Sequence, residues 1–192
     1  MWRRILSTDV MRIFSTYVAL LRGINLGGRN ILPMTDLLGL FADAGGADAR
    51  AYIQSGNVVF RAEPAVAARI SAVVEKAVAA RFGFSVPVVL RTAAELELAA
   101  KRNPFVRARA DVATLHVAFL ADQPSAAQVA ALDPHRSPPD EFVVRGREIY
   151  LRCPNGLART KLTNLYFDAK LSTTSTVRNW KTVLKLLAMT RH

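Results

Sequence analysis

The 192-residue chain has few of the residues that covalent or metal-based chemistry needs. It contains one cysteine, Cys153, so no internal disulfide can form, and we expect a reducing, cytoplasmic location. Its three histidines, His116, His135 and His192, stand far apart and not at metal-ligand spacing beside cysteines or carboxylates. We therefore expect no metal and no cofactor, and we interpret His116, in the middle of a predicted strand, as a structural residue.

Long apolar runs and familiar catalytic motifs are also missing. No run approaches the ~20 apolar residues that cross a bilayer, so we expect no membrane partner. The sequence has no C-x-x-C, no G-x-S-x-G and no obvious acid–base pair of carboxylates. These absences leave open whether the protein is an enzyme.

Acidic residues are scarce, and the resulting charge is unevenly distributed. The chain has 26 Lys and Arg against 15 Asp and Glu, a net charge of +11. Residues 145–192 hold ten basic and two acidic residues, whereas residues 92–144 hold five and seven. A basic C-terminal quarter favours acidic partners such as nucleic acid, and its arginines suit bidentate phosphate contacts. Genomic base composition explains the arginine excess equally well.

One stretch stands out, at residues 17–30: an apolar run, then a loop with three glycines, two arginines and two asparagines. An amphipathic segment follows near Pro33. Backbone N–H groups of such a loop can converge on an anion, and a following helix adds its positive end. Arg22, Asn25, Gly27 and Gly28 are therefore candidate ligand-binding residues. The alternative is that the glycines only allow a turn.

Apolar periodicity and turn residues predict the order β-α-β-β-α-β over residues 16–91, which is the ferredoxin-like motif. A tight hairpin at Gly56-Asn57 should join the second and third strands, and proline should open the second helix. The predicted elements are strands at 16–22, 51–54, 58–60 and 86–90, and helices at 35–41 and 64–82.

The same patterns predict another α+β unit with C-terminal helices in the second half, residues 92–192. It either repeats the first unit in degenerate form or is unrelated to it. We predict a capping box of Thr92 and Glu95, and we expect the helix-free sheet faces to be covered by the other lobe or a second chain. The predicted elements are helices at 92–102, 124–132, 157–171 and 177–189, strands at 114–120, 141–144 and 148–151, and a strand or linker at 172–176. Residues 1–15 are expected to be an extension, with Met11 as an alternative start and a mitochondrial-type leader as a less favoured reading.

Three further groups of polar residues are candidates for ligand binding. The first group is Gln54, Ser55 and Asn57 in the predicted hairpin, for which the pattern favours the alternative that they are ordinary turn residues. Two cations, at residues 159 and 161, stand near the start of a predicted helix, where cations are mildly unfavourable, which hints at an anion. The last predicted helix should bury Trp180 and turn its polar residues away from the core. The candidates from these two helices are Lys161, Asn164, Arg178 and Asn179.

Four separate segments resemble domain-of-unknown-function family 1697, a mainly bacterial group of soluble proteins. They are residues 21–28 (LRGINLGG), 52–60 (YIQSGNVVF), 160–164 (TKLTN) and 178–180 (RNW). The resemblance covers about residues 16–188 and departs at Lys181, where a small polar residue or asparagine is expected, and in the leader before Ser15. It implies an α+β fold with a ferredoxin-like part and no particular activity.

Three functional hypotheses follow. The leading one is binding of an anionic small molecule, phosphorylated or nucleotide-like, in a polar cleft; an enzyme using it would depend on charge stabilisation. The second is sequence-nonspecific nucleic-acid binding through the basic C-terminal region, with Tyr17 and Phe60 as the available strand rings but no RNA-recognition motif. The third is an interaction module, including a homo-oligomer, with an apolar surface patch and no ligand.

Overall fold

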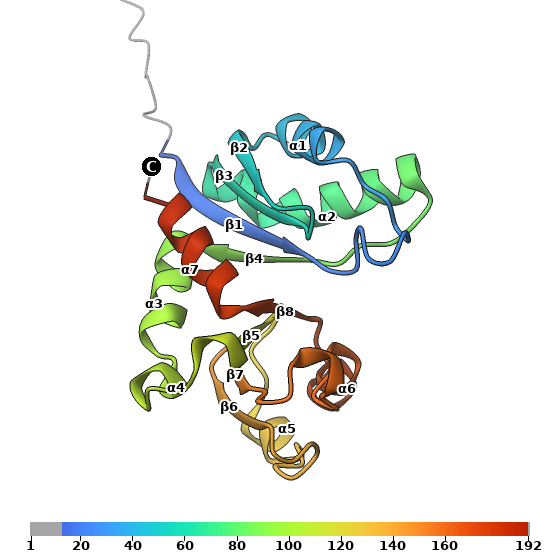
Figure 1. The fold of residues 1–192 in the computed structure, drawn as a ribbon. Coiled ribbons are helices and arrows are strands. Elements are labelled where there is room, and N and C mark those ends of the chain that lie inside the picture. Colours follow the sequence, from blue (N-terminus) through green and yellow to red (C-terminus); the bar gives the residue numbers. More distant parts are fainter. Residues whose placement is uncertain (1–12, 192) are drawn as a thin grey trace, which may run out of the picture.

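The computed structural model describes residues 13–191, so residues 1–12 of the expected extension lie outside it. The first half forms an antiparallel four-stranded sheet in the order β2-β3-β1-β4 with two helices on one face (Figure 1). Its elements are β1 (Ser15–Leu21), α1 (Met34–Asp43), β2 (Ala47–Tyr52), β3 (Asn57–Ala62), α2 (Pro64–Phe82) and β4 (Val88–Thr92).

The second half forms another antiparallel sheet, in the order β6-β7-β5-β8, and repeats the β-α-β-β-α-β order of the first. The predicted α+β fold is therefore confirmed. The elements are α3 (Ala93–Lys101), α4 (Pro104–Arg107), β5 (Leu115–Leu120), α5 (Ala126–Ala130), β6 (Glu141–Arg145), β7 (Glu148–Arg152), α6 (Asn164–Leu171), β8 (Ser175–Asn179) and α7 (Trp180–Met189).

Local signals explain several boundaries. Helix α2 begins at Pro64, whose fixed φ suits the first helical position, and ends at Gly83 with φ +77°. At the start of α3, the side chain of Thr92 accepts from the N–H of Glu95, and the Glu95 carboxylate accepts from the N–H of Thr92. The predicted capping box is thus confirmed.

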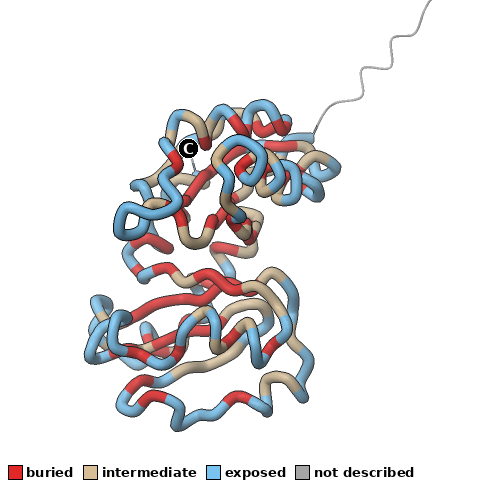
Figure 2. Tube along the Cα trace, turned by 90° about the vertical axis from the view of Figure 1, so that its right-hand side faces the viewer, coloured by how far each residue is buried: buried red, intermediate tan, exposed pale blue. Residues whose placement is uncertain are grey.

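The two helix-free sheet faces are covered by each other and by α3 and α7. Val18 and Leu20 from β1 belong to the same buried cluster as Val117 and Phe119 from β5, together with Trp180 from α7. Figure 2 shows the buried residues concentrated in the strands, with the outer loops exposed. Cover by the other lobe, one of the two expected options, is therefore confirmed. Among the described helices, none is long and apolar enough to span a membrane.

Two predicted helices begin later in the structure. Residues 157–159 form a short 3₁₀ turn, and α6 starts only at Asn164, because the Thr163 side chain accepts from the N–H of Tyr166 and caps it. The cations at 159 and 161 therefore precede this helix, and the predicted local conflict with its positive end does not arise. Likewise, α7 starts at Trp180 with Asn179 as its N-cap, so Arg178 lies in strand β8 and is buried.

The connection between β2 and β3 also differs from the prediction. Strand β2 begins at Ala47, and the two strands are joined by the four residues 53–56 rather than by a tight Gly-Asn turn. Ile53 and Gly56 both adopt positive φ there, +49° and +75°. Asn57 is the first residue of β3, in a buried position.

Candidate functional site

The two units place an arginine at the same position of their last strands. Arg91 on β4 pairs in register with Val18 of β1, and Arg178 on β8 pairs with Val117 of β5. Each guanidinium reaches across to the other unit. Arg91 Nη2 donates to the carbonyls of Leu120 and Arg147, each at 2.8 Å.

Arg178 makes the equivalent contacts in the opposite direction. Its Nη2 donates to the carbonyls of Leu21 at 2.5 Å and Gly56 at 3.3 Å, and its Nη1 donates to the carbonyl of Val177 at 2.9 Å. Leu21 and Leu120 each end the first strand of their unit, and residues 56 and 147 each precede the third strand. The two arginines are thus related by the internal repeat.

The repeat differs in the partner of the Nε atom. Arg91 Nε donates to the Glu148 carboxylate at 2.8 Å, whereas Arg178 Nε donates to the Asn57 amide oxygen at 2.6 Å. The strand register makes these residues equivalent, since Asn57 faces Leu20 of β1 and Glu148 faces Phe119 of β5. A neutral amide therefore stands near Arg178 where a carboxylate neutralises Arg91.

The helix that follows each arginine-bearing strand also differs between the two units. The third residue of α3 is Glu95, whose carboxylate pairs with Arg147 at 2.5 Å, whereas the third residue of α7 is Thr182, which has no carboxylate. Both helices are capped alike, by Thr92 and by Asn179. The site around Arg91 is therefore closed by internal carboxylates, and that around Arg178 is not.

Arg178 consequently carries a buried charge without an acidic partner among the described residues. Arg178 is 8% exposed. Burial lowers the pKa of its guanidinium to about 10, so the group remains protonated at neutral pH. For Arg91, burial also lowers the pKa, but Glu148 opposes the shift. Within the described part of the chain, the guanidinium of Arg178 donates to carbonyl, hydroxyl and amide oxygens and to no carboxylate.

A cleft of about 450 Å³ opens beside Arg178, and we call it the His116 cleft. It lies between the loop after β1, the β2–β3 hairpin and the free edge of β8, on the side of α6 in Figure 1. No carboxylate lines it within residues 13–191. Its polar lining residues are Arg22, Ser55, His116, Asn164, Thr176, Arg178, Asn179 and Thr182.

Arg22 and Asn164 reach the cleft from a hydrogen-bonded network between the units. Arg22 Nη1 donates to the Asp168 carboxylate at 2.5 Å and to the Ser175 carbonyl at 2.8 Å. The Ser175 hydroxyl donates to Asp168 at 2.6 Å and lies 3.2 Å from Asn164 Oδ1. Arg22 is therefore neutralised by Asp168, unlike Arg178.

The glycine-rich loop has a structural role in this arrangement. Asn25 Nδ2 donates to the carbonyls of Leu32 and Gln54, and its Oδ1 accepts from the N–H of Leu32, so its amide holds the loop against the hairpin. Gly27 and Gly28 adopt φ +55° and +76° in an exposed turn, and neither lines the cleft. The turn interpretation of these glycines fits the geometry better than the anion-loop interpretation.

The remaining candidates lie at different distances from the cleft wall. Asn57 is fully buried behind it, where it supports Arg178 and donates to the Ser55 hydroxyl at 2.8 Å. Gln54 is exposed on the hairpin, and Lys161 is exposed and does not line the cleft. Of the eleven candidates, the cleft collects Arg22, Ser55, Asn164, Arg178 and Asn179; their role with a ligand stays a prediction.

Sequence reasoning missed His116, Thr176 and Thr182. His116 lines the cleft, whereas Tyr17 occupies its position in the first unit, opposite Thr92 as His116 is opposite Asn179. No local sequence feature marks His116, because its access to the cleft depends on β8 being an edge strand. An alignment of the two halves of the sequence that matches Arg91 with Arg178 would place His116 opposite Tyr17 and could have drawn attention to it.

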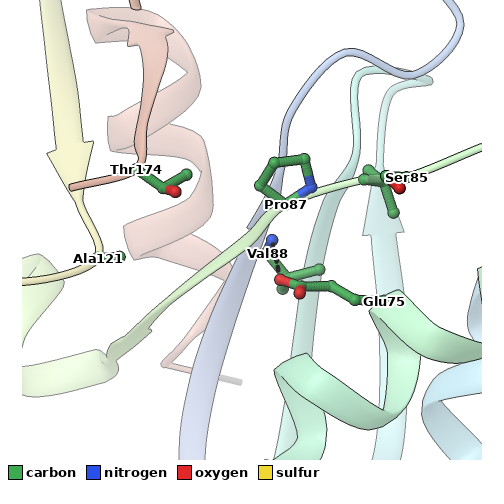
Figure 3. Close-up of a pocket in the computed structure, with 7 residues that line it drawn as sticks. Glu75, Ser85, Pro87, Val88, Ala121 and Thr174 are labelled. Carbon is green, nitrogen blue, oxygen red and sulfur yellow. Dashed lines mark hydrogen bonds between the residues drawn. The ribbon is translucent and has the colours of Figure 1, made fainter. Parts of the chain in front are cut away.

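Other sites are less suited to chemistry. A second groove, of about 290 Å³, lies between the start of β4 and the second unit (Figure 3). It contains the carboxylate of Glu75, which accepts from the N–H of Val88 at 2.7 Å, and no cation among residues 13–191 lines it. Cys153 is fully buried, and burial raises the pKa of its thiol to about 11. Within residues 13–191 no cluster of His, Cys, Asp and Glu suits a metal ion.

Comparisons with known proteins give a family and a fold. The sequence model of a family described as a protein of unknown function, DUF1697, matches residues 14–150. A solved structure, that of the conserved bacterial protein SP0830 from Streptococcus pneumoniae, is similar with a TM-score of 0.72 and 23% identity. The similarity covers 93% of this chain and 99% of that one, and at this identity it supports the fold alone. No curated protein matches the sequence.

Proposed function

We propose that this chain, which belongs to the family of unknown function DUF1697, binds a small anionic ligand in the His116 cleft. The observation that carries the proposal is the charge of Arg178, which has no acidic partner among the described residues. The same guanidinium position in the first unit is neutralised by Glu148. An external anion would supply what the second unit lacks.

Binding an anion near Arg178 would gain substantial electrostatic free energy, although the N–H donors of the guanidinium already bond to the protein. At an effective dielectric constant of 20, an anion roughly 7 Å from the guanidinium gains about 2 kcal/mol of attraction. Direct hydrogen bonds would come from the groups around it. The Asn179 Oδ1 atom is used to cap α7, which leaves its Nδ2 as a donor, and the hydroxyls of Ser55 and Thr176 lie in the same wall.

The size and rim of the cleft support a phosphorylated, nucleotide-like compound. Its volume of about 450 Å³ falls in the range that small-molecule sites commonly have. Leu26, Ile53 and Leu157 contribute apolar surface and are 63%, 52% and 37% exposed. A ligand with an anionic group toward Arg178 and an apolar ring toward these side chains matches both parts of the wall.

Nucleic-acid binding has less support. The sheet faces on which RNA-binding domains of this topology stack bases are covered here by the other unit. Phe60 is 1% exposed and Tyr17 stacks on it, so neither ring forms a platform. Several basic residues of the C-terminal quarter are engaged internally, including Arg147 with Glu95.

Isothermal titration with inorganic phosphate and with AMP at low salt tests the proposal. The decisive variant is Asn57→Asp, which restores the missing carboxylate, and Gln123→Glu makes the same chemical change at an exposed position outside the cleft. We expect the wild type and Gln123→Glu to bind and Asn57→Asp to bind about 30-fold more weakly, because the second charge cancels the first. Equal binding by all three proteins would exclude this cleft.

The competing hypotheses give different outcomes. Binding of a labelled single-stranded oligonucleotide with steep salt dependence and no competition by AMP would favour the nucleic-acid hypothesis. A concentration-dependent dimer in analytical ultracentrifugation, with no binding of either anion at millimolar concentration, would favour the interaction module.

A further inference from the structure

We infer that the ligand of the His116 cleft carries a hydroxyl or N–H donor beside its anionic group, and that His116 Nε2 accepts a hydrogen bond from it. This inference rests on the proposed function and adds the chemical class of the ligand. A hydroxylated phosphate such as a sugar phosphate or a nucleotide belongs to this class.

The tautomer of the imidazole follows from its hydrogen bond to the backbone of Thr114. His116 Nδ1 lies 3.2 Å from the carbonyl oxygen of Thr114. A carbonyl can only accept, so Nδ1 carries the proton of the neutral ring. The lone pair of the neutral ring is therefore on Nε2.

The position of Nε2 follows from which polar atoms are sealed inside the protein. His116 is 7% exposed, and its Nε2 has no hydrogen-bond partner among the described residues. Within residues 13–191, however, the one side-chain N or O atom that is both inaccessible to solvent and without a hydrogen-bond partner is Asn103 Nδ2. His116 Nε2 is not such an atom. Nε2 is therefore accessible, and the cavity that the ring lines is the His116 cleft.

The charged groups around His116 favour the neutral ring. The charged residues that line the same cleft are Arg22, after β1, and Arg178, on β8. Helices α6 and α7 contribute the uncharged residues Asn164 and Thr182, and the turn at 157–159 contributes an apolar residue. Cys153, after β7, is an uncharged thiol because burial raises its pKa. Burial lowers the pKa of His116 below its usual value, and the bond to the Thr114 carbonyl opposes this shift only in part.

Some acceptor oxygens of the wall already receive hydrogen bonds from the protein. Asn179 Oδ1 accepts from the N–H of Thr182, and the Thr176 hydroxyl accepts from Arg178 Nη1. The remaining amide and guanidinium groups are donors, which suit an anion. Among the described residues, Nε2 is an acceptor of this wall without a donor, and a ligand that leaves it unpaired would bind less well.

Titration of AMP against 2′,3′-dideoxy-AMP at pH 8 tests the inference, since the two differ only in the ribose hydroxyls. We expect the wild type to prefer AMP by about 5- to 10-fold, the effect of one hydrogen bond. His116→Phe should bind AMP and dideoxy-AMP equally well, because it offers no acceptor, and His116→Gln, which keeps an acceptor, should retain the preference. Tyr17→Phe, at the equivalent position of the first unit, is the matched control.

The pH dependence separates this role from a structural one. Below the lowered folded pKa of His116 a protonated Nε2 cannot accept, so the preference for AMP should disappear as the pH falls through that value, whereas a purely structural role would leave the preference unchanged. Thermal melting of each variant checks that it is folded. Equal binding of the two nucleotides by the wild type, or a preference that persists in His116→Phe, would overturn the inference while leaving anion binding intact. Binding of neither nucleotide would overturn the proposed function as well.

Discussion

Asn57→Asp should stabilise the protein at neutral pH, because it gives Arg178 the carboxylate that Arg91 has in Glu148. Asn57 is fully buried, and its Oδ1 is 2.6 Å from Arg178 Nε. The substitution has two costs, of which the first is the desolvation of the new buried carboxylate. Asn57 Nδ2 donates to the carbonyl of Tyr52 at 3.2 Å, and a carboxylate oxygen cannot. The other Nδ2 contact survives, since the Ser55 hydroxyl can donate instead of accept.

The magnitude follows from these effects. Charges about 4 Å apart attract by about 4 kcal/mol at an effective dielectric constant of 20. The lost bond and the carbonyl left facing an oxygen cost about 1–3 kcal/mol. Desolvation of the carboxylate offsets part of the remainder, so the variant should gain at most about 1–3 kcal/mol of unfolding free energy at pH 7.

The pH dependence of the unfolding free energy tests independently whether the new carboxylate stabilises the protein. The guanidinium should hold the pKa of the introduced carboxyl below its unfolded value of about 3.9. The gain is then present above that unfolded value and is lost as the pH falls through the lower, folded one. Urea unfolding of the wild type, Asn57→Asp and Gln123→Glu from pH 7 to pH 3 measures this. A variant less stable than the wild type at pH 7, with an unchanged pH profile, would refute the assignment of an uncompensated charge to Arg178.

Four further outcomes are expected. Glu148→Ala, which leaves a fully buried guanidinium without its carboxylate, should cost about 3–5 kcal/mol in urea unfolding; a loss below 1 kcal/mol would contradict the pairing. Cys153, with its thiol pKa raised to about 11, should resist iodoacetamide at pH 8 until the protein is unfolded, as mass spectrometry can show. Because the pKa of His116 is lowered in the folded state, stability should be complete above about pH 6.5 and fall as the pH drops through the folded value, and His116→Phe should flatten this slope. Gly56→Ala, at φ +75° and with a Cβ only 2.7 Å from a neighbouring Cβ, should cost about 2–4 kcal/mol in the same assay and weaken AMP binding.

Elements with their own end signals could be predicted from the sequence. The first turn of α2 is set by Pro64 and its end by Gly83, and the start of α3 is set by Thr92 and Glu95; each signal lies within a few residues of the boundary that it sets. Strand β8 has no such signal. Its short polar sequence becomes a strand because β5 offers it an edge, so Arg178 could not be placed in it from local pattern alone.

The candidate site could be predicted only where polar residues stand at the ends of elements that converge. Arg22 follows β1, Ser55 precedes β3 and Asn164 opens α6, and these ends meet at one cleft. Lys161 precedes the helix, whose start is set by Thr163, and it does not line the cleft. His116 lies inside a strand, and its access to the cleft depends on pairing between distant segments, which the composition of the strand does not reveal.

The most direct measurement is a crystal structure of the protein soaked in tungstate, whose heavy metal marks the position of a phosphate-like anion. We predict an anomalous peak in the His116 cleft, within hydrogen-bond distance of Asn179 Nδ2 or the Ser55 hydroxyl, and no such peak in Asn57→Asp. A peak that persists in the variant, or ions bound only at exposed arginines elsewhere, would contradict an anion site created by the uncompensated charge of Arg178.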